Sequence, residues 1–319
     1  MQKIDSSVIL SPTDLANHLA CKHVSWLNYK AMTGGPRPSK EEDELSEILR
    51  RYGTEHEATY FDALQQHLST INRTIVNLDA DRDQSAPYTV AALEERAKLT
   101  SEKLFASADA VYQPTFFSQE NGVGWVGRAD FLVATDTPSR LGDYSFEPED
   151  TKLARIAKVN AVLQLCSYAE HLTSIQGVEP EFIHVVTGSA KEGKVSIRLS
   201  EVSAYFRHVK HVLQNEVANQ FVGHSEPVPV ENCTMCRWNK DCTRWWREHD
   251  HLSFVAGLQN GHREALNAHG IHTLKEFATS PDDLAVDDIE DEALHRLRRQ
   301  AQLQYNTRVK RETDADALP

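Results

Sequence analysis

The sequence lacks any apolar run that approaches the roughly 18 residues of a membrane-spanning helix. Its first residues, MQKIDSSVILSPTD, also lack the basic and then apolar pattern of a secretory signal. Internal repeats and long low-complexity tracts are missing as well. The hydrophobic content of 40% and the charged content of 25% are ordinary for a globular protein. We therefore expect a cytoplasmic globular protein with no membrane partner.

Basic residues are outnumbered, with 34 Lys and Arg against 47 Asp and Glu, which gives a net charge of −13. This balance argues against a protein that simply coats phosphates, although basic residues could be concentrated locally. Cysteine is also scarce and odd in number, with five in the chain. Three of them, Cys233, Cys236 and Cys242, follow a C-x2-C-x5-C pattern. In a reducing compartment such spacing indicates a metal site rather than disulfides.

The apolar periodicity predicts a strand-rich centre between helices. Ser11, Pro12 and Asp14 are a capping signal for one first helix, which carries Cys21 and ends before the Gly/Pro-rich stretch at 33–40. Further helices are predicted at 41–70, 90–104, 158–175 and 201–221, and strands at 105–117, 123–135, 143–153, 181–188 and 194–199. This order predicts an α/β fold with a central mixed sheet flanked by helices.

The last part of the chain differs in texture and predicts a small all-α region. Two helical patterns break at Gly270, as in a helix–hairpin–helix unit, and a further helix is predicted at 291–309 before a polar tail. We expect a domain over 1–250 that includes the cysteine cluster, and a helical region over 251–319.

Two carboxylates and a lysine lie on neighbouring predicted strands. Asp130 lies in the strand at 123–135, and Asp150 and Lys152 are two positions apart in the next strand, so their side chains share a face. Carboxylates suit a Mg²⁺ or Mn²⁺ ion, and a lysine can orient water or offset charge on a phosphate. Glu149 points to the opposite face and is not expected to be a cation ligand. The alternative for the D-x-K tripeptide alone is a surface salt bridge.

Three further residues accompany this set. His56 follows Gly53 in a predicted helix, and Gln164 and Tyr168 are spaced i, i+4 on the helix after Lys152. Alone, His56 would be a surface residue and the other two a polar helical stripe. The whole order, G-x-x-H, an Asp strand, D-x-K and Q-x-x-x-Y, is much rarer than its pieces.

With these motifs the sequence resembles the RecB-like branch of the PD-(D/E)XK nuclease superfamily. The closer resemblance is to the CRISPR-associated RecB-like exonucleases and the AddB nuclease domain, which carry an iron–sulfur cluster. The sequence is similar above all to RecB-family nucleases that append a helical, hairpin-bearing C-terminal region. The resemblance covers residues 8–250 and, less fully, 251–319. It implies a restriction-endonuclease-like fold that cuts DNA phosphodiesters with Mg²⁺ or Mn²⁺.

The resemblance also implies a role for each matching residue. The cation would be held by the side chains of Asp130, Asp150 and His56 and by the Thr151 carbonyl. Lys152 would position the attacking water, Gln164 would orient the site, and Tyr168 would lie near the DNA strand. Many relatives have Glu where this chain has Asp150, a difference that would alter metal preference. Arg155 would contact phosphate, or be an ordinary surface charge.

The cysteine cluster needs a fourth ligand, and the candidates are Cys21, Cys166, His23 and His249. Cys166 is two positions from Gln164, about 200° around the helix, and is interpreted as a buried apolar residue. His249 would complete a local Cys3His zinc site, which spacing alone does not exclude. The resemblance implies Cys21 instead, together with Cys233, Cys236 and Cys242. These four would hold a structural [4Fe-4S] cluster, or zinc, as a clasp that joins the N-terminal and C-terminal parts.

Two segments could bind nucleic acid. Basic and aromatic residues alternate around Arg244 and Trp245, which is typical of single-strand binding, although tryptophans there could instead shield the cluster. The hairpin at Gly270 could offer backbone N–H groups to phosphate, or serve helical packing only.

The sequence therefore predicts a metal-dependent deoxyribonuclease, an exonuclease on single-stranded ends, in DNA repair and recombination or in CRISPR adaptation. Its partners would be DNA and a helicase or adaptation complex. The alternative is a non-catalytic DNA-end-binding or scaffold subunit of such a complex. A third hypothesis is a zinc-stabilised regulatory protein.

Overall fold

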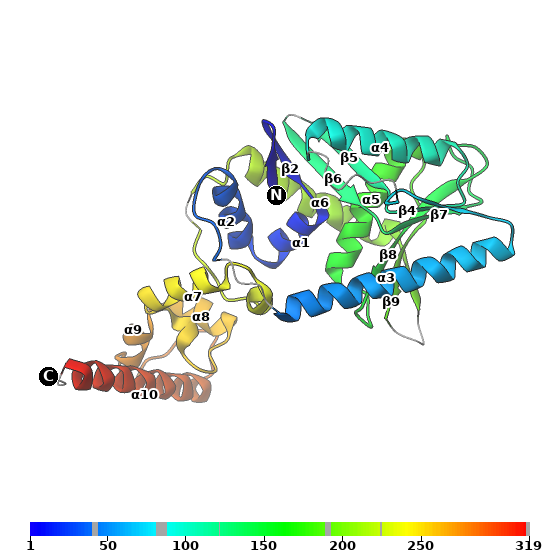
Figure 1. Ribbon diagram of the computed structural model, residues 1–319. Helices are drawn as coiled ribbons and strands as arrows, with labels where there is room; N and C mark the ends of the chain where they lie inside the picture. The colour runs from blue at the N-terminus through cyan, green and yellow to red at the C-terminus, as the bar shows by residue number, and fades with distance from the viewer. Residues whose placement is uncertain (40–43, 81–87, 121, 189–192, 224, 317–319) are drawn as a thin grey trace. The chain divides into compact units, whose positions relative to one another are not determined.

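The computed structural model describes residues 1–39, 44–80, 88–120, 122–188, 193–223 and 225–316 (Figure 1). The chain forms two compact units. The first comprises Met1–Arg37 and Glu41–Ser225, and the second comprises Pro38–Lys40 and Glu226–Pro319. The main division thus falls between Ser225 and Glu226, whereas the sequence suggested residue 250, and the cysteine cluster belongs to the second unit.

Where the structure describes it, the first unit forms two mixed β-sheets, so the α/β class is confirmed but the strands are divided between two sheets instead of a single central one. The six-stranded sheet has the order β10-β9-β8-β7-β4-β3 and the four-stranded sheet the order β1-β2-β6-β5. The strands of the larger sheet are β3 Ile75–Asn77, β4 Ala110–Tyr112, β7 Phe131–Thr135, β8 Ser145–Lys152, β9 Phe182–Thr187 and β10 Lys194–Arg198. Those of the smaller sheet are β1 Gln2–Ile4, β2 Ser7–Leu10, β5 Thr115–Glu120 and β6 Val123–Arg128.

The expected strand at 123–135 is divided between the two sheets. Its first part, β6, pairs with β5 and β2, and its second part, β7, pairs with β4 and β8. Because successive parts hydrogen-bond to different partners, the chain must turn between them. That turn carries Asp130, which is therefore outside the strands.

The described residues of the first unit form the helices α1 Pro12–Ala20, α2 Lys22–Met32, α3 Glu44–Thr70, α4 Val90–Phe105, α5 Val159–Gln176 and α6 Leu199–Ala218. The capping signal at the first helix is confirmed, since Asp14 Oδ2 accepts hydrogen bonds from the backbone N–H and the hydroxyl of Ser11. The single first helix is wrong, because the chain is extended at Cys21, with φ −160° and ψ 109°. Cys21 thus lies between α1 and α2.

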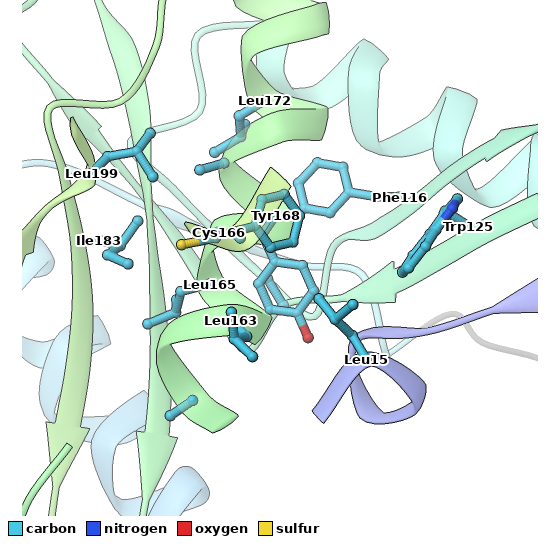
Figure 2. Close-up of a cluster of buried hydrophobic side chains, with 14 of the residues drawn as sticks. Leu15, Phe116, Trp125, Leu163, Leu165, Cys166, Tyr168, Leu172, Ile183 and Leu199 are labelled. Atoms are coloured by element: carbon cyan, nitrogen blue, oxygen red, sulfur yellow. The ribbon is translucent and has the colours of Figure 1, made fainter. Parts of the chain in front are cut away.

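The core of the first unit is built around α5, which packs against β8, β9, α1 and α6. Figure 2 shows Cys166 and Tyr168 leaving α5 in different directions, with Ile183 on the side of Cys166 and Phe116 on the side of Tyr168. Cys166 is 2% exposed, which confirms the prediction of a buried apolar residue. The long helix α3 also packs against β8 (Figure 1).

The second unit is helical throughout its described elements, as predicted for 251–319. These are the 3-10 turns η1 Glu231–Met235 and η2 Leu252–Phe254 and the helices α7 Asn239–Glu248, α8 Asn260–Ala268, α9 Leu274–Ala278 and α10 Asp291–Asp316. Helix α10 is longer than expected and extends through most of the segment that was predicted as a polar tail. Among the helices that the structure describes, none is both long and apolar enough to cross a membrane.

Candidate active site at the end of strand β8

Asp130 lies where the two sheets separate, immediately before β7. Its Oδ2 atom accepts hydrogen bonds from the Thr151 backbone N–H, at 2.7 Å, and from the Thr151 hydroxyl, at 2.8 Å. Its backbone oxygen accepts a hydrogen bond from the N–H of Gln113 at 2.8 Å. Asp130 is thus fixed to the end of the neighbouring strand β8 although it belongs to no strand itself.

Asp150 and Lys152 share one face of β8, as their spacing predicts. The Lys152 ammonium forms an ion pair with Asp150 Oδ2. The Asp150 side chain is fully buried, whereas 35% of the Lys152 side chain is exposed and can meet a substrate. Burial, followed by the negative charge of Asp130, raises the pKa of Asp150 to about 7, although Lys152 opposes this rise.

Gln164 of α5 holds Asp150, and Tyr168 of the same helix contacts Gln164. The Gln164 amide donates to Asp150 Oδ1 at 3.3 Å and to the Tyr168 hydroxyl at 2.7 Å, which confirms that the two residues share a helix face. The Tyr168 hydroxyl donates in turn to the Arg128 backbone oxygen at 2.7 Å. Tyr168 is only 2% exposed. Its observed contacts fix Gln164, and the expectation that Tyr168 lies near a DNA strand stays a prediction.

The opposite face of β8 carries a second carboxylate with a different environment. Glu149 is 1% exposed, accepts a hydrogen bond from the Tyr60 hydroxyl of α3 and forms an ion pair with Lys194. Since Gln164 of α5 reaches Asp150 and Tyr60 of α3 reaches Glu149, the two helices cover opposite faces of this strand. Glu149 thus lies on the face of β8 opposite to Asp150, as the strand period predicts.

Glu57 of α3 is a candidate site residue that the sequence motifs do not single out. Its Oε1 atom accepts hydrogen bonds from the Tyr112 hydroxyl, at 2.8 Å, and from the Gln113 side-chain amide. Burial and then the charge of Asp130 raise the pKa of Glu57, so the two carboxylates are close enough to repel each other. The only signal in the sequence is its position next to His56, on the helical face that also carries Tyr60.

His56 was predicted as an additional cation ligand. Its Nε2 atom is buried and has no hydrogen-bond partner among the residues that the structure describes. Within those residues, no three His, Cys, Asp or Glu side chains form a group arranged to hold a metal ion. The role of His56 therefore stays a prediction.

The chemical type of the donors nevertheless suits a hard divalent cation. Asp130 and Asp150 supply carboxylate oxygens, which Mg²⁺ and Mn²⁺ prefer. Burial and then the charge of Asp130 raise the pKa of Asp150, and a cation between the two carboxylates would offset their repulsion. The Thr151 carbonyl lies on the same side of β8 as the Thr151 N–H, which donates to Asp130. The predicted ligands therefore fit such an ion by their chemistry.

The close approach of Gly127 to the Tyr168 ring gives a prediction about this support. A Cβ atom at Gly127 would lie 2.8 Å from Tyr168 Cε1, so we expect Gly127→Ala to displace the ring and lower the free energy of unfolding by about 1–3 kcal/mol. Gly53 of α3 is the matched control, because nothing lies within 4 Å of its Cβ position. Gly53→Ala should raise stability by about 0.5–1 kcal/mol. Equal urea midpoints for the two variants would contradict this packing.

The four predicted cluster cysteines are divided between the two units. Cys21 belongs to the first unit, and Cys233, Cys236 and Cys242 belong to the second, and each is partly exposed. The Cys233 sulfur accepts a hydrogen bond from the Val230 backbone N–H at 3.3 Å. Such N–H donors to sulfur are a feature of metal–thiolate sites. Joint binding by the four cysteines stays a prediction.

His249, the alternative zinc ligand, lies at the end of α7. Its ring stacks on Trp245, with 4.0 Å between the ring centroids, and its Nδ1 atom is 2.8 Å from the Trp245 backbone oxygen. The Trp245 ring is therefore covered on one side by His249. Arg244 forms an ion pair with Asp241.

The remaining predicted nucleic-acid contacts have different surroundings. Arg155 is exposed in the segment 153–158 that joins β8 to α5, next to the candidate site. Gly270 has φ +76°, a left-handed conformation that glycine tolerates. The backbone N–H groups of residues 270–275 all donate to protein oxygens. Phosphate binding at this hairpin would therefore have to displace existing hydrogen bonds.

Comparison of the chain with models of protein families and with curated protein sequences found no match.

Proposed function

We propose that this protein is a divalent-cation-dependent nuclease that hydrolyses DNA phosphodiesters, as an exonuclease on single-stranded ends. The observation that carries the proposal is the convergence of Asp130, Asp150 and Lys152 at the ends of two neighbouring strands. Each carboxylate is held by a further residue, Asp130 by Thr151 and Asp150 by Gln164. A salt bridge that served only the surface would need neither support nor a fully buried carboxylate.

In the proposed reaction Asp130, Asp150 and the Thr151 carbonyl would hold the cation, with His56 as a further ligand. A bound Mg²⁺ or Mn²⁺ would lower the pKa of a water molecule and polarise the phosphate. Gln164 keeps Asp150 oriented through Oδ1, and Thr151 does the same for Asp130 through Oδ2. The partly exposed Lys152 ammonium orients the attacking water and offsets the negative charge that grows on the phosphate. Arg155, which is exposed in the segment after β8, would contact the strand that enters the site.

We further propose that Cys21, Cys233, Cys236 and Cys242 hold a structural [4Fe-4S] cluster. The N–H donor to the Cys233 sulfur supports a thiolate ligand at that position. A cytoplasmic protein of this kind would act in DNA repair and recombination or in CRISPR adaptation, together with a helicase or adaptation partner.

The proposal is tested by cleavage of end-labelled single-stranded and double-stranded DNA with Mg²⁺ and with Mn²⁺. Lys152→Ala is expected to lower the rate by at least about 10²–10³-fold, because it removes the charge that faces the phosphate. Lys194→Ala is the matched control, since Lys194 forms the equivalent ion pair with Glu149 on the opposite face of the same strand. The control should retain the rate of the parent. Equal rates for Lys152→Ala and the parent would contradict the site, and DNA binding without turnover would favour the scaffold alternative.

A further inference from the structure

Gln113 belongs to no motif of the sequence, yet its backbone lies in an unfavourable conformation beside the candidate site. It connects β4 to β5 with φ +56°, in the left-handed region. For a residue other than glycine this conformation costs about 1–2 kcal/mol. Gln113 also precedes Pro114, and a residue before proline prefers an extended backbone. Its N–H donates to the Asp130 backbone oxygen at 2.8 Å, so the strained residue is fixed to a residue of the site.

The side chain of Gln113 is also buried, and only one end of its amide group has a hydrogen-bond partner among the described residues. The residue is 5% exposed. Its amide nitrogen donates to Glu57 Oε1, which also accepts the Tyr112 hydroxyl at 2.8 Å. Its carbonyl oxygen, Oε1, is buried and has no hydrogen-bond partner within the described part of the chain. A buried oxygen without a donor costs about 1–3 kcal/mol.

Two separate costs at one residue indicate a requirement other than packing. Strained backbone and unsatisfied buried polar atoms concentrate at functional sites, where the surrounding structure maintains them. Gln113 connects two acidic residues, Asp130 through the backbone and Glu57 through the side chain. Bringing like charges together is unfavourable in a purely structural role, whereas a divalent cation requires it.

We propose that Gln113 is a positioning residue of the hydrolytic site. It holds Glu57 on the side of Asp130, so that Glu57 would become a third carboxylate of the site when a cation binds, and the Gln113 Oε1 atom would supply a neutral oxygen to the cation or to its hydration water. This inference rests on the proposed metal-dependent hydrolysis. It extends the set of residues that bind the cation from the strand ends to α3 and to the connection between β4 and β5.

The test measures cation binding separately from cleavage. The melting temperature of the parent, Gln113→Met and Gln113→Asn is measured with and without Mn²⁺ or Mg²⁺, and the Mg²⁺ concentration for half-maximal DNA cleavage is measured for each. Methionine keeps the length of the side chain but lacks the amide. Asparagine tolerates the left-handed backbone better but is too short for the contact with Glu57, and it serves if the methionine variant does not fold.

We expect both variants to need about 10–100-fold more Mg²⁺ for half-maximal cleavage and to show a smaller cation-induced rise in melting temperature. Tyr112→Phe, which removes the other donor to Glu57, should shift the Mg²⁺ requirement in the same direction but less. Unchanged Mg²⁺ requirement and unchanged cation-induced stabilisation in the Gln113 variants would overturn the inference, as would a parent protein that Mn²⁺ does not stabilise. A parent that Mn²⁺ stabilises in a Gln113-dependent way, but that cuts no DNA, would overturn only the proposed nuclease function.

Discussion

Replacing Asp150 by asparagine is expected to abolish DNA cleavage and, in metal-free protein at pH 8, to raise the free energy of unfolding. The two effects have one cause, which is the burial of a carboxylate beside a second one. Burial and the charge of Asp130 raise the pKa of Asp150 to about 7. In the unfolded chain an aspartate titrates near about 3.9. The folded protein therefore holds a proton on Asp150 that the unfolded chain has already lost over this interval.

The sign of the pH dependence follows from this difference. Between about pH 4 and pH 7 the folded state binds more protons than the unfolded state, so the contribution of Asp150 to stability falls as pH rises. Above pH 7 the full penalty of a buried charge is present, and at pH 4 it is absent. We expect Asp150→Asn to stabilise metal-free protein by about 1–3 kcal/mol at pH 8, after allowing for the lost ion pair with Lys152, and by little at pH 4. Urea unfolding in a chelator measures both values.

Glu149 provides the control on the neighbouring position of the same strand. Its carboxylate accepts a hydrogen bond from the Tyr60 hydroxyl and forms an ion pair with the Lys194 ammonium, so both neighbours stabilise it in the folded protein. Glu149→Gln should therefore lower stability at pH 8 and leave the catalytic groups in place. A rise in stability for both variants, or for neither, would show that the repulsion between Asp130 and Asp150 is not what sets the stability of this site. Loss of activity with gained stability is the usual signature of a functional site.

The parts of the site that the sequence predicts are those that depend on local periodicity. The shared face of Asp150 and Lys152 follows from the strand period of two, and the contact of Gln164 with Tyr168 follows from the helix period. The position of Asp130 in a turn is harder to predict, because the division of 123–135 between two sheets depends on which distant strands pair with each half. Nothing in those residues alone indicates a turn at this position.

Glu57 and Gln113 were missed for a related reason. They are 56 positions apart, and neither has a spacing that indicates a partner. Their contact exists because α3 crosses the sheet next to the connection between β4 and β5, an arrangement that many distant contacts determine together. The break at Cys21 likewise interrupts a pattern of Leu15, Leu19 and Val24 that local rules treat as one helix.

Replacing Cys21 by serine is expected to remove a bound metal and to lower the stability of the protein at the same time. Cys21 is separated from Cys233 by roughly 200 residues, so a metal that joins them closes a long loop. The free energy of metal binding then stabilises the folded chain. Anaerobically purified parent should absorb near about 400 nm and contain iron, as thiolate-bound clusters do. The Cys21→Ser variant should lose both the absorbance and the iron, and should unfold at a lower temperature.

Cys166→Ser is the matched control, because the Cys166 thiol is 2% exposed within the core around α5. Burial raises the pKa of this thiol to about 12, which disfavours the thiolate that binds metal. This variant should lose some stability through the buried hydroxyl but keep its iron.

A parent that contains zinc without absorbance, and keeps it in Cys21→Ser but loses it in His249→Ala, would instead establish a local site of three cysteines and one histidine. The Cys21→Ser and His249→Ala variants thus distinguish a metal that joins distant parts of the chain from one that stabilises the second unit alone.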